Sequence, residues 1–175
     1  TEPDAVASFG LQREQSGVAV LYGLGLYLLF LPAIYGAGML WPWCLEALGE
    51  TPEAQAVLVN FANVHGARLV VALLLATLVV PFLEEFLFRG FLQPFLVQNF
   101  HDRGGVVLTA VFFALLHGTS AFLPIFVLGL LLGAVALKTR RLYASWAIHA
   151  VHNGSMLFLF LRYPDLASPS GGWLG

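Results

Sequence analysis

The chain has 175 residues, of which 59% are hydrophobic and only 10% are charged, and its mean hydropathy is +0.83. A soluble domain carries about 25% charged residues to solvate its surface, so this composition favours an integral membrane protein. The net charge of −2 excludes the basic surface that a nucleic-acid partner requires. The single cysteine excludes an internal disulfide. We expect one membrane domain over residues 1–175.

The first apolar run, Gly17–Trp43, is long enough to cross a hydrocarbon core of roughly 30 Å, which needs about 20 helical residues. Pro32 is expected to kink this span, and the Trp-Pro-Trp triplet at its end is typical of a membrane interface. Residues 1–16 form an N-terminal segment before it. After it, a Thr-Pro-Glu start predicts a short interfacial helix from about Pro52 to Val64.

The second span is predicted from about Ala67 to Asn99. It is too long for one straight crossing, so we expect it to be tilted, or broken at Pro81 or Pro94. His101–Gly105 then reads as a turn.

The rest of the chain folds back as shorter spans. Residues 106–137 are expected to form two of them, with a break near Gly118–Pro124, and 142–161 to form the last span. Residues 164–175 are predicted to be a flexible tail. The resulting fold class is an all-α, polytopic transmembrane helical bundle.

Few charges decide the orientation. Arg103 and the Lys138–Arg141 cluster lie at the two ends of the hairpin, and basic residues favour the cytoplasmic side. We therefore place both on that side of the membrane.

Three ionisable residues, Glu84, Glu85 and Arg89, lie in the middle of the second span. At a bilayer centre they cost on the order of 8–10 kcal/mol before pairing. Glu85 and Arg89 are four residues apart and can pair on one helix face, which would be a structural role. Glu84 points about 100° away from Glu85, so that role does not account for it, and we interpret it as functional.

Other polar groups lie in other spans: His117, His149, His152 and Asn153. Polar bonds between membrane helices are worth only about 0.6 kcal/mol on average, which does not offset their burial. At about 1.5 Å per residue, Glu84, His117 and Asn153 lie about 15–17 Å deep and His149 about 11 Å. These side chains are therefore predicted to converge on one polar cavity within the membrane.

A carboxylate and an imidazole can hold and deprotonate a water, and a second imidazole with an amide can stabilise an oxyanion. Together they can hydrolyse an acyl bond. The alternative is a zinc site with Glu84, His117 and His149 as ligands. The H-E-x-x-H spacing that would favour a metal is absent from the sequence.

Two other classes of intramembrane protease lack their residues. The aspartyl type needs two membrane aspartates, but Asp4, Asp102 and Asp165 all lie outside the predicted spans. The serine type needs an exposed serine in a G-x-S-x-G-like setting, which neither Ser120 nor Ser155 has. A glutamate that activates water is the hypothesis that remains.

Three motifs in chain order resemble those of the CAAX protease and bacteriocin-processing family of intramembrane proteases. "EEFLFR" fits E-E-x-x-x-R, "FALLH" fits F-x-x-x-H, and "HAVHN" fits H-x-x-x-N. They begin at Glu84, Phe113 and His149. Each motif alone is weak, but all three in order, each in a predicted span, are specific.

The resemblance implies a role for each residue. The catalytic set would be Glu84 as the base, His117 helping to hold the water, and His149 with Asn153 as the oxyanion hole. The supporting set would be Glu85, Arg89, Phe113 and His152. The family requires no tightly bound metal, so no cofactor is expected.

We expect an intramembrane endopeptidase with a catalytic core at about 67–162, in a bacterial inner membrane, opening toward the cytoplasm. Its partners would be membrane lipid and a peptide or protein substrate, lipidated or not: a prenylated C-terminal motif, a bacteriocin leader or a sorting tail. The oligomeric state is left open. The alternative is a non-catalytic membrane scaffold, or an immunity or sorting factor, of the same fold. A proton-coupled carrier would need an inverted repeat, and the sequence shows none.

Overall fold

The computed structural model describes residues 16–51, 61 and 64–163. These residues are 91% helical and include no strand, which confirms the all-α prediction. The predicted N-terminal segment and the tail at 164–175 lie outside the described residues, apart from Ser16. Most of the predicted interfacial helix lies outside them too, with only Phe61 and Val64 described.

Helix α2 (Ser16–Ala47) contains the first predicted span and extends beyond it at both ends. It continues through Pro32 and Pro42 without interruption. With 32 residues it is about 48 Å long. Since this exceeds the roughly 30 Å hydrocarbon core, the helix can cross a membrane with length to spare.

The second predicted span is one long helix with two widened turns. Its parts are α4 (Ala67–Leu74), η1 (Leu75–Val79), α5 (Val80–Glu85), η2 (Phe86–Leu92) and the first arm of α6 (Gln93–Leu115). Both η1 and η2 are π-helical turns. Each ends two residues before a proline, so the helix is widened ahead of Pro81 and Pro94 instead of being broken at them.

The sharp break lies further on, at Phe100 and His101. Phe100 has φ −125° and ψ 15°, and His101 has φ 58° and ψ 172°, so α6 folds back on itself there. The turn predicted at His101–Gly105 is therefore shorter, and Asp102 begins the second arm. The two arms meet where Gly105 lies against Val97: a Cβ added to Gly105 would lie 2.5–2.6 Å from Val97 atoms.

The predicted break near Gly118–Pro124 is confirmed. The second arm of α6 ends at Leu115, and the short helix η3 (Thr119–Ala121) leads into α7 (Phe122–Thr139). Helix α8 (Leu142–Arg162) follows after a two-residue connection.

Three helical stretches within the described residues are long and apolar enough to cross a membrane: Ser16–Ala47, Ala67–Leu115 and Thr119–Thr139. Helix α8 is not among them, although it has 21 residues. It carries His149, His152 and Asn153, which reduce its apolar character. That α8 is the last span therefore stays a prediction.

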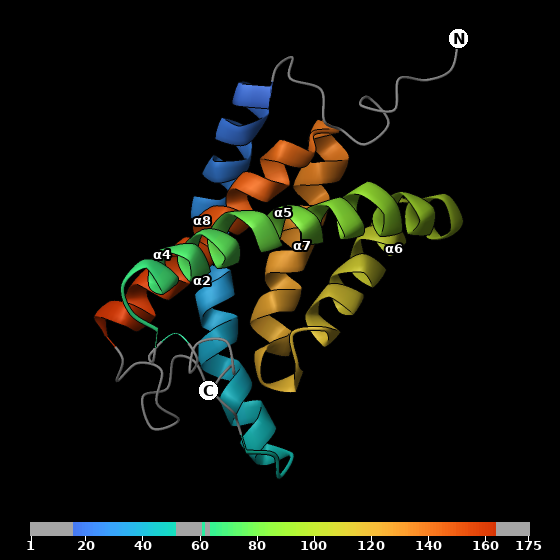
Figure 1. The fold of residues 1–175 in the computed structure, drawn as a ribbon. Coiled ribbons are helices and arrows are strands. Elements are labelled where there is room, and N and C mark those ends of the chain that lie inside the picture. Colours follow the sequence, from blue (N-terminus) through green and yellow to red (C-terminus); the bar gives the residue numbers. More distant parts are fainter. Residues whose placement is uncertain (1–15, 52–60, 62–63, 164–175) are drawn as a thin grey trace.

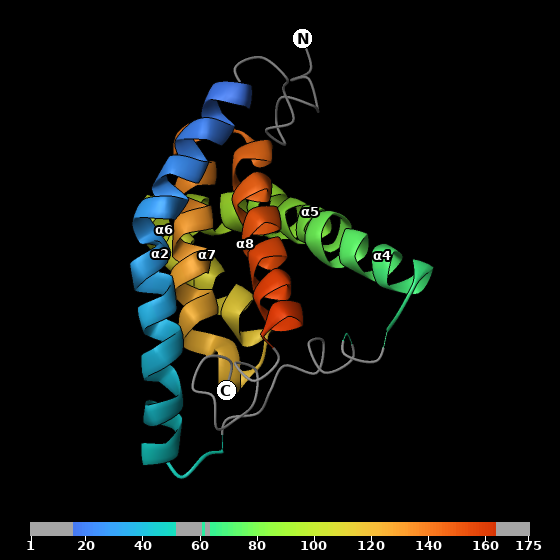
Figure 2. The same cartoon turned by 90° about the vertical axis from the view of Figure 1, so that its left-hand side faces the viewer.

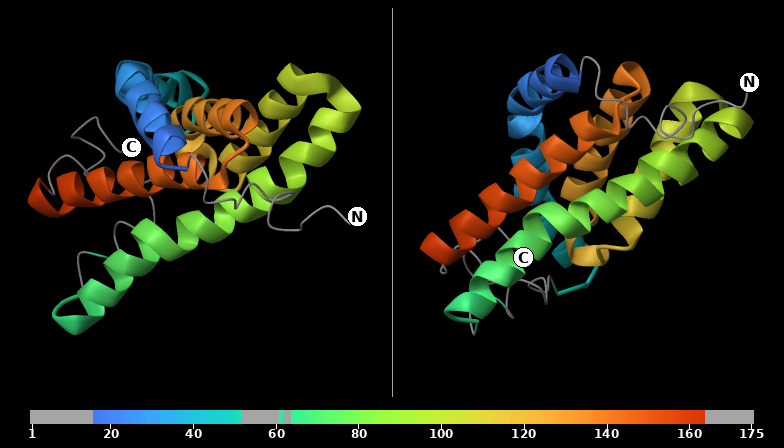
Figure 3. Two further views of the ribbon diagram at one scale, coloured as in Figure 1. Left: turned by 90° about the horizontal axis from the view of Figure 1, so that it is seen from above. Right: turned by 45° about the horizontal axis from the view of Figure 1, so that its top comes forward.

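Helix α7 lies at the centre of the bundle and contacts α2, α6 and α8. Figures 1 and 2 show α2 and α7 lying along similar axes with opposite chain directions, while the long helix from α4 to α6 runs across them. Helix α8 lies along the long helix and runs antiparallel to it, as the right panel of Figure 3 shows. The functional motifs of the long helix and of α8 are thereby brought together.

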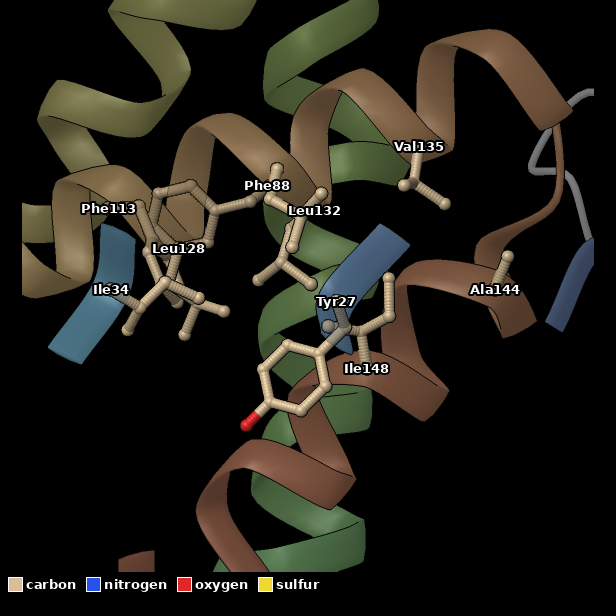
Figure 4. Packing of buried hydrophobic residues seen from close by; sticks show 10 residues of the cluster. Tyr27, Ile34, Phe88, Phe113, Leu128, Leu132, Val135, Ala144 and Ile148 are labelled. Atoms are coloured by element: carbon tan, nitrogen blue, oxygen red, sulfur yellow. The ribbon is translucent and has the colours of Figure 1, made fainter. Parts of the chain in front are cut away.

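The main core lies where these helices cross (Figure 4). It joins residues from five elements: Tyr27, Ile34, Phe88, Phe113, Leu128, Leu131, Leu132, Val135, Ala144 and Ile148. A second cluster packs Leu157 and Phe160 of α8 beside Leu69 and Leu73 of α4. The core therefore fixes α8 against the long helix on both sides of the site.

Gly105→Ala is expected to lower the free energy of unfolding by about 1–3 kcal/mol, because the new methyl group overlaps the Val97 backbone. Gly25→Ala is the matched control, since a Cβ at Gly25 meets nothing within 4 Å. Thermal melting of both variants in the same detergent measures the difference. Equal melting temperatures would contradict the close packing of the two arms of α6.

Candidate active site

The site is built on a buried ion pair within the long helix. Arg89 Nη1 donates to Glu85 Oε1 at 3.0 Å, and both side chains are fully buried. The contact predicted from their four-residue spacing is thus confirmed. A charge pair so placed repays its desolvation only with further hydrogen bonds.

Arg89 makes those further contacts with two neighbouring helices. Its Nη2 donates to the carbonyl of Gly129 in α7 at 3.3 Å. Its guanidinium carbon lies 4.5 Å from the centre of the Phe113 ring of α6, which is within cation–π range. Arg89 therefore connects the long helix to α7 and to the second arm of α6, directly beside the predicted catalytic residues.

His149 of α8 lies between the two adjacent glutamates. Its Nδ1 is 3.0 Å from Glu85 Oε1, and its Nε2 is 3.5 Å from Glu84 Oε2. Both ring nitrogens can donate to these carboxylates only when the imidazole is protonated. The motifs at Glu84 and at His149 are thus in direct contact, across 64 residues of sequence.

The two glutamates differ in exposure. The side chain of Glu85 is 0% exposed and paired, whereas that of Glu84 is 28% exposed. Only Glu84 can therefore reach a water molecule or a substrate.

Phe113 connects the third motif to the other two. Its ring is fully buried, and its centre lies 4.6 Å from that of His117 and 5.5 Å from that of His149. His117 Nδ1 is 2.7 Å from the Phe113 carbonyl oxygen, which can only accept. The Nδ1 atom therefore donates, and in the neutral imidazole Nε2 keeps a free lone pair.

Asn153 is placed by a carbonyl that a proline leaves available. In η1 the N–H of Val80 donates five residues back, to Leu75. Pro81, which would donate to Ala76 in the same register, has no N–H. The side-chain amide of Asn153 donates to the Ala76 carbonyl instead, at 3.1 Å. One amide hydrogen is used in this bond and a second one is left.

Trp146 makes a similar contact with a carbonyl two residues further along the long helix. Its indole Nε1 donates to the Leu78 carbonyl at 3.0 Å, and its ring packs edge-on against Phe82. Trp146 was not among the predicted site residues, because a single tryptophan in an apolar helix gives no signal of a tertiary backbone contact. Pro81 did carry a signal for Asn153, because a proline in a helix always frees a carbonyl.

His152 contacts α2 instead of the long helix. It is buried and its Nδ1 is 3.2 Å from the Tyr27 hydroxyl of α2. The other predicted site residues lie around the crossing of the long helix with α8: Glu84, Glu85, Arg89, Phe113, His117, His149 and Asn153. His152 lies at the contact between α8 and α2.

Within the described part of the chain, no three His, Cys, Asp or Glu side chains are grouped so that they could hold one metal ion. A hollow of about 660 Å³ lies at the corner of α6, lined by Val97 and residues 100–104. None of the predicted site residues lines it. This hollow is therefore not the predicted cavity around Glu84, and that cavity stays a prediction.

A family model described as "Type II CAAX prenyl endopeptidase Rce1-like" matches residues 66–155. The match covers just over half of the chain and includes all three motifs. The chain therefore belongs to the Rce1-like family, a family of membrane peptidases. A search of curated proteins and a search of solved structures found no match. Helix α2 lies outside the matched residues.

Arg89→Gln is expected to lower the free energy of unfolding by about 3–5 kcal/mol, because it leaves the Glu85 carboxylate buried without its cation. The double variant Glu85→Gln/Arg89→Gln should recover part of this loss, since no unpaired charge remains. Arg103→Gln, at an exposed position, is the control. Unfolding in detergent mixtures measures all of them. If the double variant lost the sum of the free energies of unfolding that the two single variants lose, the Glu85–Arg89 ion pair would be contradicted.

Proposed function

We propose that this chain is an intramembrane endopeptidase that hydrolyses a peptide bond at the membrane surface with water activated by Glu84 and His117. Family membership supports peptide hydrolysis in general terms. The observation that carries the finer proposal is the unequal environment of the two adjacent glutamates, one paired and buried and the other reachable.

Glu84 is the general base in this proposal. A carboxylate locked in an ion pair is a poor proton acceptor, which argues against Glu85. Within the described residues, Glu84 Oε2 makes no short hydrogen bond: Nε2 of His149 lies 3.5 Å away, which is too long for a strong one. Its lone pairs are therefore available to a water.

His117 is the second acceptor for that water. With its Nδ1 proton engaged by the Phe113 carbonyl, its Nε2 can accept one O–H while Glu84 accepts the other. A water bound in this way directs a lone pair at the substrate. The role needs the imidazole in its neutral form.

Asn153 and His149 stabilise the developing oxyanion. The Ala76 carbonyl fixes the orientation of the Asn153 amide, so its second N–H has a defined direction. The Nε2–H of His149 is held only loosely by Glu84 and can donate to the oxyanion as well.

The reaction follows from these roles. The water oxygen bonds to the peptide carbonyl carbon while its proton passes to Glu84. The carbonyl oxygen becomes an anion, which Asn153 and His149 stabilise. The carbon–nitrogen bond then breaks, the nitrogen takes the proton from Glu84, and the products are a carboxylic acid and an amine.

Glu84→Gln is expected to lower kcat/KM by about 10²–10⁴-fold, because the amide cannot accept the water proton. The fold should persist, since Glu84 takes no part in the Glu85–Arg89 pair. Cleavage by the purified protein in detergent, measured with mass spectrometry, is the assay. Glu46→Gln, at an exposed position, is the matched control.

Three peptide probes define the substrate class: a prenylated C-terminal motif, a leader peptide and a hydrophobic sorting tail. Unchanged cleavage by Glu84→Gln would sink the proposed base. Wild-type protein that binds one of the probes but never cleaves it, with biological function retained in Glu84→Gln, would establish the scaffold alternative instead.

Cleavage is expected to persist in a strong chelator, because the proposed reaction takes its base and its oxyanion donors from side chains. The measurement is the initial rate with and without chelator, and after zinc is added back. Loss of cleavage that zinc restores would contradict this, and would assign Glu84, His117 and His149 to a metal site.

A further inference from the structure

Two neighbouring faces of helix α8 contact two different helices. His149 and Asn153 contact the long helix, through Glu84, Glu85 and the Ala76 carbonyl. Ile148 and His152, each one position earlier, contact α2. Neighbouring residues in a helix point about 100° apart. Any rotation of α8 against α2 therefore moves His149 and Asn153 against the long helix.

The contact between α2 and α8 is close, and it is polar at the Tyr27 hydroxyl. At Gly23 an added Cβ would lie 3.1 Å from Ile148 Cδ1 and 3.4 Å from the Ala144 carbonyl oxygen, so the helix backbones approach here. One turn later, the Tyr27 hydroxyl is 3.2 Å from His152 Nδ1, with the two rings edge-on at 6.0 Å. Tyr27 is 3% exposed and His152 is 6% exposed.

The hydrogen bond has a directional effect that the apolar contacts lack. Tyr27 and Ile148 belong to the same buried cluster (Figure 4), and such packing tolerates small rotations of a helix. A hydrogen bond weakens steeply when its angle changes. The Tyr27–His152 bond therefore selects one rotation of α8 out of those that packing allows.

We propose that Tyr27, from a helix that the family model does not cover, is a positioning residue for the active site. Its hydrogen bond to His152 sets the rotation of α8 and thereby orients His149 and Asn153 for the reaction. The kinetic part of this proposal rests on the function proposed above, whereas the orientation of His149 does not.

Tyr27→Phe removes one oxygen atom and keeps the ring. We expect kcat to fall about tenfold with KM changed less than about twofold, because substrate binding does not involve Tyr27. His152→Phe should have a similar effect, and the double variant should be no worse than either one. Tyr22→Phe is the matched control: its ring lies on the same helix beneath Lys138 of α7, and its kcat should match the wild type.

A second readout needs no activity. With ¹⁵N-labelled histidine, the ring signals of His152 and of His149 should both shift in Tyr27→Phe, and neither should shift in Tyr22→Phe. Five histidines make this spectrum tractable, and His152→Phe assigns one of them. A His149 signal that stays unchanged in Tyr27→Phe would overturn the proposal, as would additive losses in the double variant.

The two proposals fail differently. If the wild type cleaves none of the probes while both histidine signals shift in Tyr27→Phe, the positioning role stands and the peptidase function falls. If Tyr27→Phe lowers the melting temperature as far as Gly105→Ala does and raises KM, Tyr27 supports only the fold, and the proposal is rejected.

Discussion

The Glu85 carboxylate is the point on which three helices depend. A single oxygen, Oε1, accepts from Arg89 on its own helix and lies 3.0 Å from His149 of α8, while Arg89 continues to the Gly129 carbonyl of α7. A buried charge in an apolar bundle is tolerated only while these partners stay in place. The register of the long helix against α7 and α8 is therefore set by the same contacts that leave its neighbour Glu84 open to water.

Patterns within single segments of the sequence predicted most of the helices and the ion pair at the site. Composition and apolar runs predicted an all-α membrane bundle and the break before α7. The four-residue spacing of Glu85 and Arg89 predicted their pairing, and so identified Glu84 as the unpaired carboxylate. These predictions succeed because helix periodicity and the cost of burying charge act within one segment, where the sequence is sufficient.

The contacts between segments could not be predicted in the same way. Pro81 indicates that a carbonyl is freed, but nothing in the local pattern indicates that Asn153 is its partner. Nor does the pattern indicate that Trp146 contacts Leu78 or that Tyr27 contacts His152. The long helix was expected to be tilted, or broken at Pro81 or Pro94, but it continues through both prolines, with an expanded turn before each one. Whether a proline breaks or widens a helix depends on which group donates to the freed carbonyl. At Pro81 that donor is Asn153, which lies 77 residues after Ala76 in the chain.

The expanded turn at η1 also has a consequence for biosynthesis. The Ala76 carbonyl receives the Asn153 amide, which is 77 residues later in the chain, and the Leu78 carbonyl receives Trp146, 68 residues later. While the ribosome is still making α6 and α7, the Asn153 amide does not yet exist, and an Ala76 carbonyl without a donor is costly in lipid. The middle of the long helix must therefore keep water beside it until α8 emerges and docks. Docking of α8 then replaces that water with the Asn153 side chain.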